Sequence, residues 1–115
     1  MSDPREVLDR LSSVRGLRGS ALVSAADGLV VADSLMTGVD GRALAALAAS
    51  LAIRLRRTVE AAGRRPPAFL QLQAAGGAVL AAPCGPDLVL VAIATTEANV
   101  GLARLEMLEA ARRLG

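Results

Sequence analysis

Hydrophobic and polar residues recur along this chain with two periods, one helical and one of two residues, and these periods mark out its elements. Between residues 7 and 14 the apolar positions lie on one side of a helix. Asp3 before Pro4 supplies an N-cap and a proline at the first helical position, and Gly16 supplies the left-handed exit. These signals predict a short first helix with one apolar face.

Two short apolar runs rich in Val and Leu follow, at residues 20–24 and 29–33. They flank Ala25-Ala26-Asp27-Gly28, and an Asp-Gly pair adopts the positive φ of a tight turn at little cost. The pattern predicts a β-hairpin, then a loop at 34–40, and then the longest helix of the chain at 41–62.

Three more strand-like runs occupy residues 68–74, 78–84 and 88–95, and glycine-containing turns separate them. The first run alternates polar and apolar residues, as a half-exposed strand does, and the last is almost continuously apolar, as a central strand is. Residues 96–114 predict a closing helix. The order α-β-β-α-β-β-β-α predicts one domain, residues 1–115, of the α/β (α+β) class, with one five-stranded antiparallel sheet and helices on its faces.

The helix predicted at 41–62 carries more apolar surface than one sheet can bury. At about 100° per residue, one stripe covers roughly a third of its circumference and is predicted to pack on the sheet. The residues of this stripe are Leu44, Leu47, Ala48, Leu51, Leu55 and Val59. A second stripe of mostly small residues runs beside it, at Ala45, Ala49, Ala52 and Arg56, with Ala46 and Ile53 further round. Small residues at these intervals let a second helix approach closely, and an antiparallel copy of the same helix would be self-complementary.

These features predict a homodimer, or a heterodimer with a paralogous chain, in which the second stripe and the half-polar strand meet the partner. The predicted interface residues are Ala45, Ala46, Ala49, Ala52, Ile53, Arg56, Arg57, Gln71 and Gln73. In the alternative interpretation, the alanines serve helix propensity alone and the glutamines lie on an ordinary solvent-facing strand. The densest basic region is either a solvated face or a surface that steers an acidic protein partner, and it comprises Arg54, Arg56, Arg57, Arg64 and Arg65.

Composition argues against several classes of function. Hydrophobic residues make up 53% of the 115 residues, the formal net charge is only +2, and all thirteen basic residues are Arg. Trp and Tyr are absent and acids interleave with the arginines, so no nucleic-acid partner is expected. No secretory signal and no apolar stretch of membrane-spanning length is present, so no membrane insertion is expected. The single cysteine, Cys84, indicates a reducing compartment, the cytoplasm.

The residue types that carry most catalytic chemistry are missing. Without His the commonest general base is absent, and without Lys there is neither a Schiff-base residue nor a phosphate-binding P-loop. Cys84 ends an apolar strand and has no His to activate it, which favours a buried structural thiol over a nucleophile. The acidic residues are dispersed, without the spacing of a calcium loop. We therefore expect no enzymatic activity, no metal and no cofactor.

The segment from Gly19 to Asp33, GSALVSAADGLVVAD, resembles the first hairpin of roadblock/dynein light-chain domains, in which an Asp-Gly turn joins two apolar strands. The likeness continues through the Ala/Leu-rich long helix, the apolar strand at 88–95 and the start of the last helix at 99–104. This resemblance implies a profilin-like (roadblock) fold and dimers joined through the long helix and a neighbouring strand. It also implies a role as a platform or regulator for small Ras-like GTPases. The bacterial branch that the chain resembles is that of the MglB-like regulators, and the Arg-only usage is typical of a GC-rich bacterial source.

The function that this resemblance implies is a non-catalytic dimeric module that acts as a scaffold or a GTPase-activating regulator. One alternative is a small-ligand sensor of profilin-like or PAS-like type, with a cavity between sheet and helix. Against it stands the shortage of aromatic and buried polar residues that usually line such cavities. The other alternative is a purely structural assembly subunit, and the sequence leaves these readings open.

Overall fold

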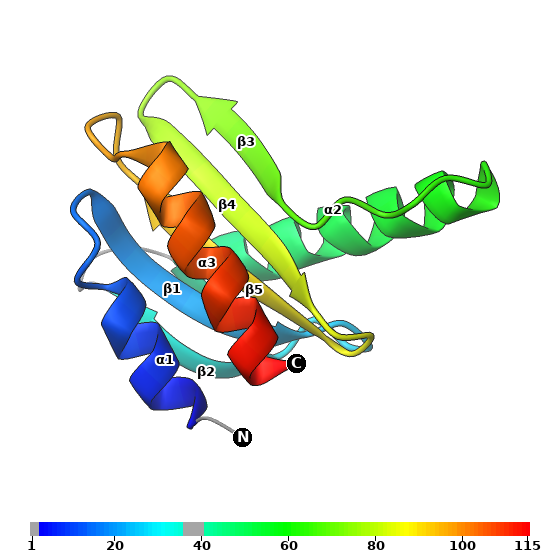
Figure 1. Cartoon of the computed structure of the whole chain (residues 1–115), viewed down its shortest axis with the longest axis horizontal. Helices are drawn as coiled ribbons and strands as arrows, with labels where there is room; N and C mark the ends of the chain where they lie inside the picture. The colour runs from blue at the N-terminus through cyan, green and yellow to red at the C-terminus, as the bar shows by residue number, and fades with distance from the viewer. Residues whose placement is uncertain (1–2, 36–40) are drawn as a thin grey trace.

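A computed structural model describes residues 3–35 and 41–115 of the chain. The predicted fold class and element order are confirmed, and Figure 1 shows the arrangement of the elements. The elements are α1 (Pro4–Leu11), β1 (Leu17–Ser24), β2 (Val30–Leu35), α2 (Gly41–Ala61), β3 (Leu70–Ala74), β4 (Gly77–Cys84), β5 (Leu88–Ala94) and α3 (Val100–Leu114).

Several predicted boundaries change. Strand β1 begins three residues earlier than predicted, at Leu17. Strand β2 continues to Leu35, into the loop predicted at 34–40, and residues 36–40 of that loop lie outside the described residues. Strand β3 begins at Leu70, after the prolines and two further residues. Helix α3 begins at Val100 because Asn99 caps it: the Asn99 side-chain oxygen accepts a hydrogen bond from the backbone N–H of Leu102 at 3.0 Å.

The sheet has the strand order β2-β1-β5-β4-β3, and every neighbouring pair is antiparallel. Strand β5 lies in the middle of the sheet, between β1 and β4. Its sequence is almost continuously apolar because helices cover both of its faces. The alternating β3 lies at one edge and β2 at the other. The predicted central position of β5 is therefore confirmed. The prediction that β3 is half-exposed is wrong for the single chain, because every residue of β3 after Leu70 is exposed.

Helix α2 covers one face of the sheet, but it does so with its alanines. Ala45, Ala48, Ala49 and Ala52 are buried, and they pack in one cluster with Ala21, Val23, Ala81, Val89 and Val91 of the sheet. The prediction that Leu47, Leu51 and Leu55 face the sheet is wrong, because these three side chains are exposed. At about 100° per residue, the helix is turned by roughly a quarter of its circumference from the predicted orientation.

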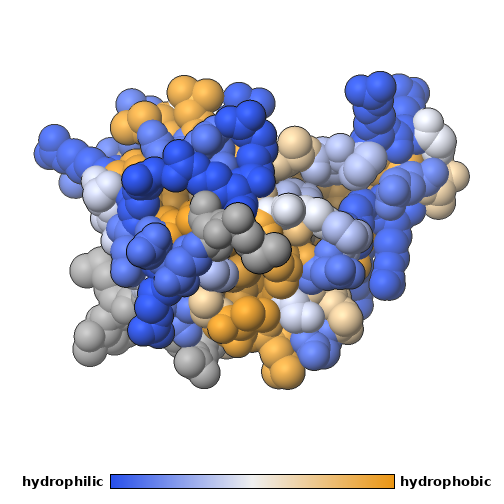
Figure 2. All heavy atoms as spheres, turned by 60° about the horizontal axis from the view of Figure 1, so that its bottom comes forward, coloured by the Kyte–Doolittle hydropathy of each residue, from blue (hydrophilic) through white to orange (hydrophobic). Residues whose placement is uncertain are grey.

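The physical reason for this orientation is the size of the side chains that meet. Alanines let the backbone of α2 lie close to a sheet face that is itself made of Ala and Val. Leucines at the same positions would hold the helix further away and leave gaps beside the small residues of the sheet. Leu47, Leu51 and Leu55 consequently stay on the surface. Figure 2 shows one face of the molecule, on which hydrophobic residues lie in the middle and hydrophilic residues on both sides.

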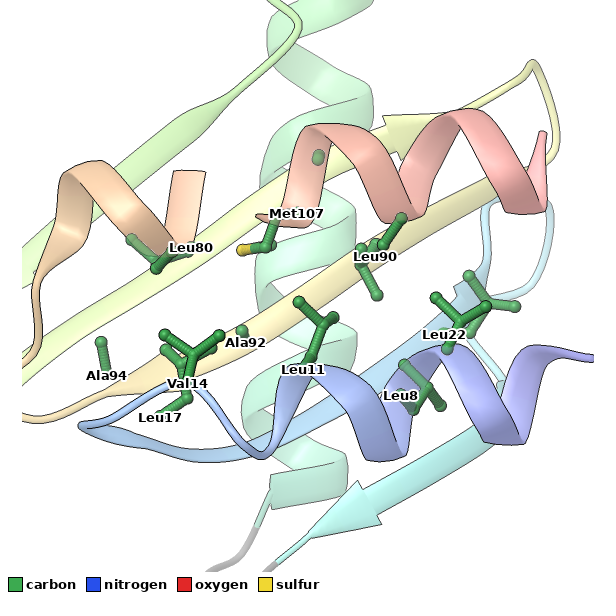
Figure 3. Packing of buried hydrophobic residues seen from close by; sticks show 14 of the residues in the cluster. Leu8, Leu11, Val14, Leu17, Leu22, Leu80, Leu90, Ala92, Ala94 and Met107 are labelled. Atoms are coloured by element: carbon green, nitrogen blue, oxygen red, sulfur yellow. The ribbon is translucent and has the colours of Figure 1, made fainter. Parts of the chain in front are cut away.

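The other face of the sheet is covered by α1 and α3, and it holds the larger side chains of the core. Leu8 of α1 and Met107 of α3 are fully buried against Leu22, Leu80 and Leu90 of three different strands. Figure 3 shows these residues pointing toward one another between the two helices and the sheet. The protein thus has three layers, with large side chains packed in one interface and small ones in the other.

Candidate interaction surface

Helix α2 has three sides with different compositions. The alanine side, already described, contacts the sheet. The leucine side consists of Leu47, Leu51 and Leu55, whose residues are 57%, 43% and 37% exposed. The arginine side faces the β1–β2 turn, and its residues include Ala46, Ser50, Ile53, Arg54 and Arg57. Because these sides are spaced around one helix, the sheet of a single chain covers only the alanine side.

The leucine side adjoins the part of the sheet that ends in β3. Leu44, one turn before Leu47, lines an apolar hollow of about 240 Å³ together with Val79 of β4 and Ile93 of β5. Leu70 and Val79 pack against the alanine cluster, so their side chains lie on the face of the sheet that α2 covers. Alternation along β3 places Leu72, which is 41% exposed, on that same face. An apolar surface therefore runs from the leucine side of α2 to the edge strand β3.

The two edge strands differ in how well they are protected against pairing with another chain. The register between β1 and β2 is interrupted between Leu22 and Val23, and Asp33 of β2 lies opposite Ala21, on the α2 face. Such a bulge and an inward-facing charge both discourage edge pairing. The β3–β4 register, in contrast, runs without interruption from Leu70 to Ala74, and β3 contains neither a charged residue nor a proline. The β3 edge is the one open to a further strand.

The predicted interface residues occupy four different environments. Ala45, Ala49 and Ala52 are buried under the sheet of their own chain, so they offer no surface to a partner, which corrects that part of the prediction. Ala46, Ile53 and Arg57 lie on the arginine side of α2. Gln71 and Gln73 are exposed on β3, and the Gln71 side-chain amide donates a hydrogen bond to that of Gln73 at 3.3 Å.

Arg56 is directed toward its own chain. Its guanidinium donates to the backbone carbonyl oxygen of Pro86, in the β4–β5 turn, at 3.4 and 3.5 Å. Sequence reasoning did not place four exposed apolar residues on this candidate surface, and these are Leu47, Leu51, Leu55 and Leu72. The leucine stripe was visible in the sequence, but helical periodicity alone cannot tell which of two adjacent apolar stripes meets the sheet.

The C-terminal part of α2 leaves the body of the protein. Among the described residues of α2, none after Ala52 is buried, and Figure 1 shows this end of the helix projecting beyond the sheet. Residues 54–65 contain five arginines and one glutamate. The projecting end is therefore basic on one side, while Leu55 and Val59 continue the apolar side.

Cys84 is the one cysteine of the chain, and its side chain is free and buried. Burial raises the pKa of Cys84 from 9.0 to about 11, so the thiol stays protonated at neutral pH. The thiol donates to the backbone carbonyl oxygen of Ala82 at 3.5 Å. The described residues contain no group of three or more His, Cys, Asp or Glu side chains positioned to hold a metal ion. No described helix is both long and apolar enough to cross a membrane.

The described residues thus form a five-stranded antiparallel sheet with two helices on one face and one long helix on the other, and an apolar surface lies open beside the edge strand β3. The chain belongs to the Roadblock/LC7 family, because the model of the Roadblock/LC7 domain matches residues 5–94. The predicted family is therefore confirmed.

Individual relatives agree with this assignment. The Methanocaldococcus jannaschii protein MJ1340, itself described as uncharacterized, is 30% identical over 108 residues, which span 94% of this chain and 93% of that protein. The structure of Myxococcus xanthus MglB is similar with a TM-score of 0.84 and 22% identity, covering 96% of this chain and 90% of MglB. The Roadblock/LC7 domain from Streptomyces avermitilis is similar with a TM-score of 0.75 and 20% identity, covering 97% and 94%. These structural likenesses agree in fold with the predicted MglB-like branch.

Proposed function

We propose that the protein is a non-catalytic dimeric module of the cytoplasm, which binds or regulates a small Ras-like GTPase. The observation that carries the proposal is the leucine side of α2, exposed next to the unprotected edge of β3. A two-fold axis beside Leu51 would place the leucine sides of two antiparallel α2 helices against each other. The same axis would bring the two β3 edges together and extend the sheet across both chains.

The projecting end of α2 supports this arrangement. The part of α2 after Ala52 is short, and short helical segments are marginally stable in water unless they pack against other parts of a protein. In one chain the residues after Ala52 have little to pack on. In the antiparallel pair, each projecting end lies along the first half of the partner helix, where Leu47 is exposed. The second copy thus supplies the contacts that the single chain lacks.

Two features support a GTPase as the partner: membership of the Roadblock/LC7 family, and the surface that remains after pairing. A solved structure of MglB, similar to this chain with a TM-score of 0.83, has a tetrameric arrangement, so assembly of this fold has a precedent. Two α2 helices side by side would present their arginine sides together on one broad surface, suited to a protein partner.

The first test is the mass of the purified protein by light scattering across a concentration series. A mass near twice 11.7 kDa supports the paired helices, and a strict monomer at every concentration refutes them. The second test is calorimetric titration with a purified Ras-like GTPase encoded in the same genome, loaded with GDP or with a non-hydrolysable GTP analogue. Tighter binding of one nucleotide state supports regulation, and absence of binding to every such GTPase removes that part of the proposal.

A further inference from the structure

The arginine side of α2 forms one wall of a groove, and the β1–β2 turn forms the other. The groove has a volume of about 350 Å³. Ala25, Ala26, Asp27 and Gly28 line it from the turn, and Ala46, Ser50, Ile53, Arg54 and Arg57 line it from the helix. The turn holds its shape partly through Asp27, whose carboxylate accepts a hydrogen bond from the backbone N–H of Leu29 at 3.1 Å.

The charges in this groove are not balanced. Among the described residues, neither Arg54 nor Arg57 forms an ion pair with a carboxylate. This differs from the end of α3, where Glu109 pairs with two arginines and where these pairs lower the pKa of its carboxyl group. The groove therefore carries two unpaired guanidinium groups against one carboxylate, and that carboxylate is already engaged in the turn. An occupant with a net negative charge would complement it.

The lining of the groove also favours a peptide over other anionic partners. Half-buried Ala46 and Ile53 give the groove an apolar floor, which suits an aliphatic side chain between acidic ones. Single-stranded nucleic acid gains affinity from stacking on aromatic side chains, and no aromatic residue lines the groove. A lipid surface contacts projecting side chains and does not enter a groove between a turn and a helix.

We infer that this groove docks an acidic segment of the partner protein, with an aliphatic residue on Ala46 and Ile53 and carboxylates on Arg54 and Arg57. The inference rests on the proposed function, because pairing of the leucine sides is what leaves the arginine sides as the free surface. Two copies of the groove, related by the two-fold axis, would then flank the paired helices and hold one partner on either side.

The test uses the full chain and a fluorescein-labelled eight-residue peptide of Asp and Glu with one central Leu, followed by fluorescence polarisation at low salt. Arg57→Glu reverses one charge in the groove and is expected to weaken binding about tenfold. Ser50→Trp fills the groove without changing its charge and is expected to weaken binding as much. Arg5→Glu makes the same charge change at an exposed residue of α1, on the opposite face of the sheet, and is expected to leave binding unchanged.

Each outcome decides the inference. Equal binding by wild type and Arg57→Glu overturns it, and so does an equal loss in Arg5→Glu, since that loss would reflect net charge alone. Binding of the wild type to phosphatidylglycerol vesicles or to single-stranded DNA, with none to the peptide, also overturns it. Light scattering of each variant separates the two proposals: a dimeric Arg57→Glu that no longer binds the peptide supports the groove, whereas a monomeric wild type refutes the dimer independently of the peptide result.

Discussion

Substitution of Leu51 tests the paired helices most directly, because Leu51 lies in the middle of the leucine side. Complete burial of a leucine side chain stabilises by about 1.5–3 kcal/mol. Leu51 is 43% exposed in the single chain, so burial of the remainder contributes roughly 0.6–1.3 kcal/mol per copy. A symmetric dimer carries the substitution in both chains, so the lost burial amounts to roughly 1.3–2.6 kcal/mol of dimerisation free energy. Leu51→Ala is therefore expected to raise the dimer dissociation constant by about 10- to 80-fold.

Leu51→Asp goes further, because it places two carboxylates against each other in an apolar surface, and we expect a monomer at micromolar concentration. Sedimentation velocity over a concentration series measures both effects. Since Leu51 is exposed in the single chain, circular dichroism of either variant should show the fold retained, and the only loss expected in a monomer is helical signal from the projecting end of α2. Leu105→Ala is the matched control, because Leu105 is 63% exposed on α3, away from α2. If Leu51→Asp sediments as the wild type does, the leucine side is not the dimer interface.

Three further predictions follow from other parts of the structure. Leu72→Lys introduces an inward-facing charge into β3, so it should weaken dimerisation in the same sedimentation assay, and an unchanged dissociation constant would count against the β3 edge. Gly77→Ala should lower the free energy of unfolding by about 2 kcal/mol or more in thermal melts. Gly77 has φ +147°, and an added Cβ would lie 2.2 Å from the Ala94 carbonyl oxygen. Gly76→Ala is the control, because Gly76 has open space around it, and this variant should melt as the wild type does. The unfolded chain releases the Cys84 proton near pH 9 and the folded chain near pH 11, so the unfolding free energy should fall as pH rises through that interval, an effect that Cys84→Ala should remove.

Helix α2 shows how far sequence reasoning reaches and where it stops. The sequence predicts that this segment is a helix and that its apolar residues exceed what one sheet can cover, and both statements hold in the structure. It does not predict which stripe is inside. Leucine is more hydrophobic than alanine, so a ranking by hydrophobicity places Leu47 and Leu51 in the core. The structure reverses the order because the opposing sheet face consists of Ala and Val.

The sequence predicted some features of the candidate interaction surface and not others. Gln71 and Gln73 already indicated an exposed strand, and the arginines near the end of α2 already indicated a basic surface. The groove was not predictable, because it joins Asp27 of the β1–β2 turn to Arg54 and Arg57, nearly thirty positions further along the chain. Only the packing of α2 across β1 brings these residues to one place.

The sequence by itself determined the order of the elements, the central place of β5 and the family, because each depends on local periodicity and on turn residues. Only the tertiary structure decided the rotation of α2 and, with it, which residues stay on the surface. That rotation depends on how closely the backbone of α2 can approach the sheet, which is a property of two surfaces in contact and is not encoded in either segment alone.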